Sequence, residues 1–198
     1  MILEIFKNTI RSLKTDVNGK KRKITVKYVI FLCIPLLSLA LVRFNMENKF
    51  MDNPTIFASL LSLFIGLIFG VLMKIPDKLG ELKIKEDDSV KVQNKKNQAY
   101  NFLVSFRDYL SFSIVLAIFI IILIVINNFF PELTTINIKN YSDKISYFEL
   151  TKKSICFYLI FIFRFFLSWG IFSFIFYLVL TISNLYEFIV YEFQRHYK

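Results

Sequence analysis

The chain has 198 residues, of which 56% are hydrophobic and 18% aromatic, and it carries a formal net charge of +10. With a mean hydropathy of +0.54 it is too apolar for an ordinary soluble domain, and its few Gly and Pro exclude a loop-rich or collagen-like fold. The abundance of Lys, Ile, Asn, Phe and Tyr is typical of an AT-rich bacterial gene. We therefore expect an all-α protein of a bacterial membrane.

Residues 1–27 form a basic segment in front of the first apolar run. Apolar side chains recur there at helical spacing, namely Ile2, Phe6, Ile10 and Leu13. This pattern predicts a short amphipathic helix, lying either in the membrane interface or on the protein's own cytosolic face. Four consecutive cations stand just before the first span: Lys20, Lys21, Arg22 and Lys23.

The rest of the chain, residues 28–198, reads as a domain of four transmembrane helices. The predicted spans cover about 28–43, 54–73, 109–127 and 155–183, with a cytosolic helical insert over 74–108. Pro35 predicts a kink in the first span, and Asn53-Pro54 predicts an N-cap followed by proline at the first helical position. The third span, without a polar side chain from Ile114 to Ile126, is expected to face lipid.

Small residues recur every fourth position along the second span. The stripe consists of Ala58, Ser62, Gly66 and Gly70. Such a face lets a neighbouring helix approach closely, so it predicts a helix-packing surface. The alternative is the lining of a pore.

Arg164 is the only charged residue in the apolar run from Ile155 to Ser183. Counting about 1.5 Å per residue from Ile155 puts it near the membrane midplane, where a charge is costly. Its guanidinium could bond to carbonyls or hydroxyls of a neighbouring helix. Alternatively, it faces a hydrated space together with Ser168, one turn further on, and an oligomer would then carry a positively charged ring in its pore.

The distribution of cations predicts the topology. Eighteen Lys and Arg fall in the amino-terminal segment, the middle loop and the tail, against six in the two other loops. By the positive-inside rule, both termini and the middle loop are cytosolic, at the inner membrane. The cytosolic cations then bind lipid headgroups or an anionic ligand such as a nucleotide or oligonucleotide. The residues chosen for this role are Lys20, Lys21, Arg22, Lys23, Lys95 and Lys96.

The sequence lacks the residue patterns of common catalytic and metal sites. His196 is the single histidine, there is no Cys-x-x-Cys and no glycine-rich phosphate loop, and no carboxylate falls inside a span. Cys33 and Cys156 fall near opposite membrane faces, which argues against a disulfide between them. We expect no catalytic residue, metal or cofactor, so the protein is not expected to be an enzyme. Asp108 beside Arg107 is expected to form a local ion pair.

Four spans with small outer and cytosolic parts enclose little space in one protomer, so a pathway would need several copies. In span number, size and basic cytosolic face the chain resembles the small four-pass membrane effectors of bacterial anti-phage defence operons. That resemblance implies a homo-oligomeric channel or membrane-permeabilising effector, controlled by a nucleotide or oligonucleotide signal, and assigns no residue roles. The alternative is a structural or accessory subunit of a larger membrane complex, with an operon-encoded protein partner.

Overall fold

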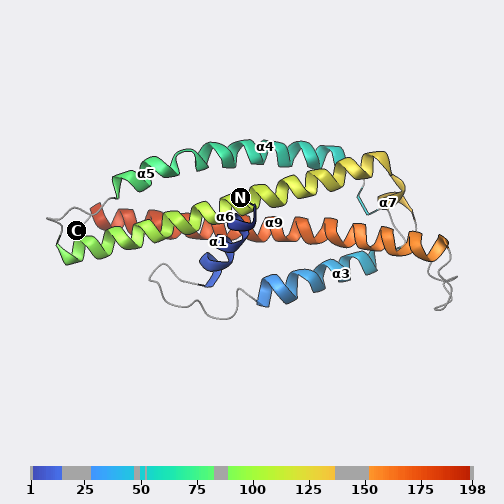
Figure 1. Cartoon of the computed structure of the whole chain (residues 1–198), viewed down its shortest axis with the longest axis horizontal. Coiled ribbons are helices and arrows are strands. Elements are labelled where there is room, and N and C mark those ends of the chain that lie inside the picture. The colour runs from blue at the N-terminus through green and yellow to red at the C-terminus, as the bar shows by residue number, and fades with distance from the viewer. Residues whose placement is uncertain are drawn as a thin grey trace. The chain divides into compact units, whose positions relative to one another are not determined.

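The computed structural model describes residues 2–14, 28–46, 50–51, 53–82, 89–136 and 152–196. Helices account for 92% of these residues, and none of them forms a strand, which confirms the all-α class. In chain order the elements are α1 (Ile2–Lys14), η1 (Val29–Cys33), α3 (Ile34–Phe44), α4 (Pro54–Leu72), α5 (Ile75–Glu81), α6 (Val90–Phe129), α7 (Glu132–Thr135) and α9 (Lys152–His196). Figure 1 labels the α-helices.

Three helices are long and apolar enough to cross a membrane, which supports a multi-pass membrane protein. They cover Pro54–Gly80, Val92–Phe129 and Ile155–Val190. The first predicted span corresponds to a shorter apolar helix, Val29–Phe44. Within the predicted insert over 74–108, the described residues form α5 and the first part of α6. The last helix runs beyond the predicted span to His196.

Prolines determine where several helices begin, bend or end. Pro35 has no N–H to donate, and its ring would clash with the carbonyl four residues earlier; the helix before it widens into the π-helical turn η1. Pro54 is the first residue of α4, as predicted. Pro76 prevents α4 from continuing unbroken, and the chain turns at Met73 and Lys74 before α5.

The chain divides into two compact units. The first contains Met1–Lys27, Phe64–Val115 and Phe174–Lys198, and its core joins α4 and α5 with α6. Apolar residues at spacings of three and four form the α4–α5 side of this core: Ile68, Leu72, Ile75 and Leu79. They pack against Leu103, Phe106 and Leu110 of α6, and Leu178 and Phe188 of α9 cover the cluster.

The second unit contains Tyr28–Leu63 and Leu116–Ser173. A close approach of α6 and α9 lies at Gly170, where an added Cβ would stand 3.0 Å from Cγ1 of the buried Ile120. A second cluster places Met46 and Ile160 at its centre, covered by residues of α7 and the start of α9. Gly170 therefore has, within the chain, the close-packing role that the sequence assigned to the stripe on the second span.

The third predicted span, which was expected to face lipid, is covered in part by its own chain. In α6, 44% of the most apolar stretch is buried inside the protein, against 11% in α4. Leu116, Ala117, Ile120 and Ile124 are all buried. Hydropathy does not separate the two cases, because a helix packed inside a membrane protein and a helix facing lipid are both apolar.

Leucine substitutions at two glycines test this packing. Gly170→Leu forces a side chain into Ile120 and should destabilise the protein by about 1–3 kcal/mol. The matched variant Gly66→Leu places the same side chain where nothing lies within 4 Å, so the fold of the single chain should be unaffected. The measurement is the unfolding temperature by far-ultraviolet circular dichroism in detergent, at a dilution that keeps the chain monomeric. An equal loss at both positions would contradict the assignment.

Candidate functional site

Arg164, in α9, lies at a buried polar centre of the second unit. Its side chain is 0% exposed. Nε donates to the carbonyl oxygen of Leu133 at 2.9 Å, and Nη1 donates to that of Asn45 at 3.3 Å. Nη2 donates to the carbonyls of Thr134 at 3.0 Å and Ile136 at 2.6 Å. A guanidinium has five N–H groups, so four hydrogen bonds leave little capacity for a further ligand.

The acceptors explain how a charge can be buried here. Asn45 is the C-cap of α3, and Leu133, Thr134 and Ile136 belong to α7 and its C-cap. Carbonyls at helix C-termini have no partner within the helix and carry partial negative charge, which a cation stabilises. The ring of Phe50 lies 5.7 Å from Cζ. Within the part of the chain that the structure describes, Arg164 forms no ion pair, so carbonyl oxygens compensate its charge.

These contacts place Arg164 beside the ends of two apolar helices. The carbonyls it binds come after the last residues of α3, which ends at Phe44, and of α6, which ends at Phe129. The start of α9 contributes Cys156, Phe157 and Ile160 to the cluster around Met46. The predicted depth of Arg164 in a membrane stays a prediction.

Ser168, the second residue proposed to face a pathway, is also buried. Its hydroxyl donates back to carbonyls of its own helix, at 2.9 Å to Arg164 and 3.0 Å to Phe165. Both side chains lie in the interior of the second unit, so the geometry favours the structural alternative for Arg164. Its chemical role is to hold the ends of α3 and α7 against α9.

Substitutions of Arg164 test this role. Arg164→Leu removes the side-chain donor of four carbonyls, of which Thr134 keeps the backbone N–H of Phe50, and should cost about 3–5 kcal/mol of stability. Arg164→Lys keeps the charge, but its shorter reach and three donors should give a smaller loss, about 1–3 kcal/mol. The unfolding temperature in detergent is the measurement, with Ser168→Ala as the control on the same helix. A stability of Arg164→Leu equal to that of the control would contradict the role.

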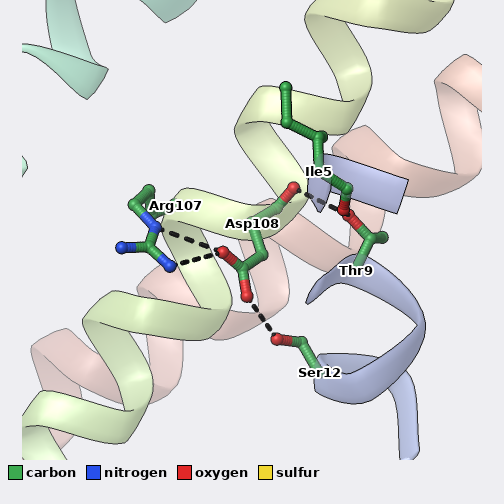
Figure 2. A network of polar contacts seen from close by, with 5 residues as sticks. All are labelled: Ile5, Thr9, Ser12, Arg107 and Asp108. Atoms are coloured by element: carbon green, nitrogen blue, oxygen red, sulfur yellow. Dashed lines mark hydrogen bonds and ion pairs between the residues drawn. The ribbon is translucent and has the colours of Figure 1, made fainter. Parts of the chain in front are cut away.

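A second polar centre, in the first unit, surrounds Asp108 of α6 (Figure 2). Oδ1 accepts from Nε and Nη2 of Arg107, at 3.1 Å and 2.9 Å, which is the ion pair predicted from sequence. Oδ2 accepts from the hydroxyl of Ser12 in α1 at 2.7 Å. Tyr109 donates through its hydroxyl to the carbonyl of Ser12 at 3.0 Å. The hydroxyl of Thr9 lies 2.8 Å from the carbonyl of Ile5 and 3.3 Å from that of Asp108.

This centre fastens α1 to α6. Ser12 and Asp108 are both buried, and a carboxylate at such a position is stable only when donors surround it. Sequence reasoning found the Arg107–Asp108 pair because the two residues are neighbours. It missed Thr9, Ser12 and Tyr109 because their partners lie about a hundred positions away in sequence. The signal that could have found them is the pair of hydroxyls, Thr9 and Ser12, that follows Ile5 at helical spacing beside the apolar side of the predicted helix.

Removing one hydroxyl should loosen α1. Ser12→Ala deletes a hydrogen bond to a charged acceptor, worth about 1.5–3 kcal/mol, and should raise amide hydrogen exchange throughout α1. Lys7→Ala, on the exposed side of the same helix, should leave that exchange unchanged. If the two variants exchange alike, Ser12 does not hold α1 in place.

The remaining predicted site residues are not gathered into one site. In the stripe on α4, Ser62, Gly66 and Gly70 are exposed, and an added Cβ at either glycine would meet nothing within 4 Å. The stripe is therefore open within the chain, and its packing role stays a prediction for a second molecule. Lys95 and Lys96 are half-buried in α6, and each takes part in a polar or electrostatic interaction. The remaining cations of that set, Lys20–Lys23, lie outside the described residues.

Among the described residues, no group of three or more His, Cys, Asp or Glu side chains is placed to hold a metal ion. Cys33 is exposed and Cys156 half-buried, and neither is in a disulfide.

No protein-family model matches the chain, and no curated protein or solved structure shows significant similarity to it. The two polar centres and the open face of α4 are thus the features from which a function is argued.

Proposed function

We propose that this chain crosses the membrane four times and self-associates through α4 to form a channel or membrane-permeabilising effector. The supporting observation is the exposure of α4, of which only 11% of the most apolar stretch is buried within the chain. Its outward side chains include Ile56, Leu60, Leu63, Phe64 and Leu67. A helix with so little burial in its own chain must be covered by lipid or by another helix.

The stripe on α4 favours another helix over lipid for one part of this surface. Lipid chains fill the space around large side chains as well as a protein does, but small residues bring two backbones close enough to gain packing and weak hydrogen bonds. The hydroxyl of Ser62 donates to the carbonyl of Ala58 at 2.9 Å, so its hydrogen is directed back to its own helix. If several copies of the chain joined through this face, their α4 helices would lie around a common axis.

The two polar centres support the fourth crossing, which η1 and α3 would make. If α4 crosses, then Asn45, before it, and Asp108, after it, lie on opposite sides of the membrane. Ser12 is bonded to Asp108, so α1 lies on the side opposite to Asn45. The chain between α1 and Asn45 must therefore cross as well. The helical stretch Val29–Phe44 is about 24 Å long, which is short for a crossing and requires local thinning or snorkelling of flanking cations.

The same contacts agree with the topology given by the cation count. The Arg164 centre joins residues after the first and third predicted spans, both of which the count places outside. The Asp108 centre joins the amino-terminal helix to the inner end of the third span, both of which the count places in the cytosol. Both termini are then cytosolic, at a bacterial inner membrane. We further propose that an anionic controlling signal binds the cytosolic cations Lys20, Lys21, Arg22, Lys23, Lys95 and Lys96.

The accessory-subunit alternative uses the same open face of α4. A partner of different sequence would then cover the stripe in place of a second copy. An enzymatic role has no support in the two centres, since the donors of Arg164 and the oxygens of Asp108 are engaged by the protein itself.

Cysteine cross-linking tests self-association. In a background with Cys33→Ser and Cys156→Ser, Gly66→Cys should give a disulfide-linked dimer in the membrane. Phe64→Cys should not, because it is also exposed but lies on the far side of α4 from the stripe. Cross-linking at both positions would indicate random collision.

The mass of the purified protein and its conductance in planar bilayers separate the two functions. A discrete oligomer that conducts, with conductance reduced by Gly66→Leu, supports the channel. A single chain without cross-links supports the accessory subunit. An oligomer that does not conduct under any of the tested voltages or anionic signals would overturn the channel while leaving self-association intact.

A further inference from the structure

The apolar side of α1 is wider than the surface with which it contacts the protein. At about 100° per residue, Ile5, Thr9 and Ser12 share the side that meets α6, and all three are buried or half-buried. Ile2 and Phe6 flank that side and are 62% and 47% exposed, and Leu3, further round the helix, is 82% exposed. The helix thus presents an apolar surface, which we call the α1 outer face, to something other than its own chain.

The position of α1 along α6 indicates what that surface meets. It is fastened at Asp108 and Tyr109, and its Phe6 ring lies 5.9 Å from that of Phe112. Asp108 is the last charged residue of α6, and the uncharged stretch from Tyr109 to Phe129 is about 32 Å long. Since the hydrocarbon layer is about 30 Å thick, Asp108 marks its boundary and α1 lies at the level of the lipid headgroups.

We propose that the α1 outer face is a lipid-binding surface at the headgroup boundary of an anionic leaflet. This inference rests on the proposed crossing of α6. Ile2, Leu3 and Phe6 insert between the first acyl carbons, and the exposed Lys7, on the flank of the helix, pairs with anionic headgroups. Ser12 and Thr9 hold the buried side of the helix against Asp108. The helix then satisfies a carboxylate on its buried side while its exposed apolar residues bind lipid.

Environment-sensitive fluorescence on the full chain in vesicles tests the proposal. In the background with Cys33→Ser and Cys156→Ser, a nitrobenzoxadiazole dye is attached to Leu3→Cys or, as a matched control on the polar flank, to Glu4→Cys. At position 3 we expect blue-shifted emission, strong quenching by spin labels attached high on the acyl chain, and little quenching by aqueous iodide. At position 4 we expect the reverse. A third label, at Ile122→Cys in α6, reports whether that helix is in lipid.

Each contrary result has a distinct meaning. Quenching by iodide at position 3 equal to that at position 4 would show a water-exposed surface and overturn the proposal. Protection of position 3 from both quenchers would show a protein cover, such as a second copy, and also overturn it. If the label at position 122 is not quenched by the lipid spin labels, the crossing of α6 and the lipid surface are both overturned. If only the label at position 3 is not quenched by them, the crossing of α6 still stands.

Lipid charge provides the last arm. Replacing part of a zwitterionic lipid with an anionic one should increase the blue shift at position 3, and Lys7→Gln should remove that increase. A blue shift that is independent of lipid charge in the parent protein would overturn the assignment to an anionic leaflet.

Discussion

A fully buried guanidinium without a carboxylate partner among the described residues has to be surrounded by other oxygen acceptors, and this requirement organises the second unit. Arg164 obtains its acceptors from backbone carbonyls at the ends of α3 and α7. Those carbonyls accept no hydrogen bond inside their own helices. The arginine therefore supplies them with donors, and they supply the guanidinium with acceptors. Three segments far apart in sequence are thereby held at one level. Phe50 adds a fourth, through its backbone N–H bonded to the carbonyl of Thr134 at 2.9 Å.

The Asp108 centre is the same device with the opposite charge. A carboxylate near the apolar boundary obtains donors from Arg107, its neighbour, and from a hydroxyl of α1. In both centres a charge on a long apolar helix is stabilised by a short segment from elsewhere in the chain. Burying the charge costs free energy unless that segment is present. The charge therefore determines where the segment docks and also stabilises the docked segment. Apolar packing alone would fix such positions less uniquely.

The sequence was sufficient for features that depend on composition and near neighbours. Apolar runs predicted the membrane-length helices, Pro54 predicted the start of α4, and adjacency predicted the Arg107–Asp108 pair. It was insufficient wherever two distant segments meet. The acceptors of Arg164 lie about 30 and 119 positions away, and the role of Gly170 depended on Ile120 lying opposite. Hydropathy gave no sign that part of α6 is covered by its own chain, because it measures how apolar a residue is and not what covers it.

The contrast between α6 and α4 links the fold to the proposed function. Both are strongly apolar, yet α6 places Ala117 and Ile120 in the interior while α4 leaves its glycines uncovered. The close approach that small residues permit is used within the chain at Gly170 and left unused along α4. A stripe needed only for lipid contact would gain nothing from glycine, which also lowers helix stability relative to larger residues. The stripe therefore imposes a cost on the single chain that a close-packed second helix would offset, and this asymmetry is the physical reason for proposing that α4 contacts another chain.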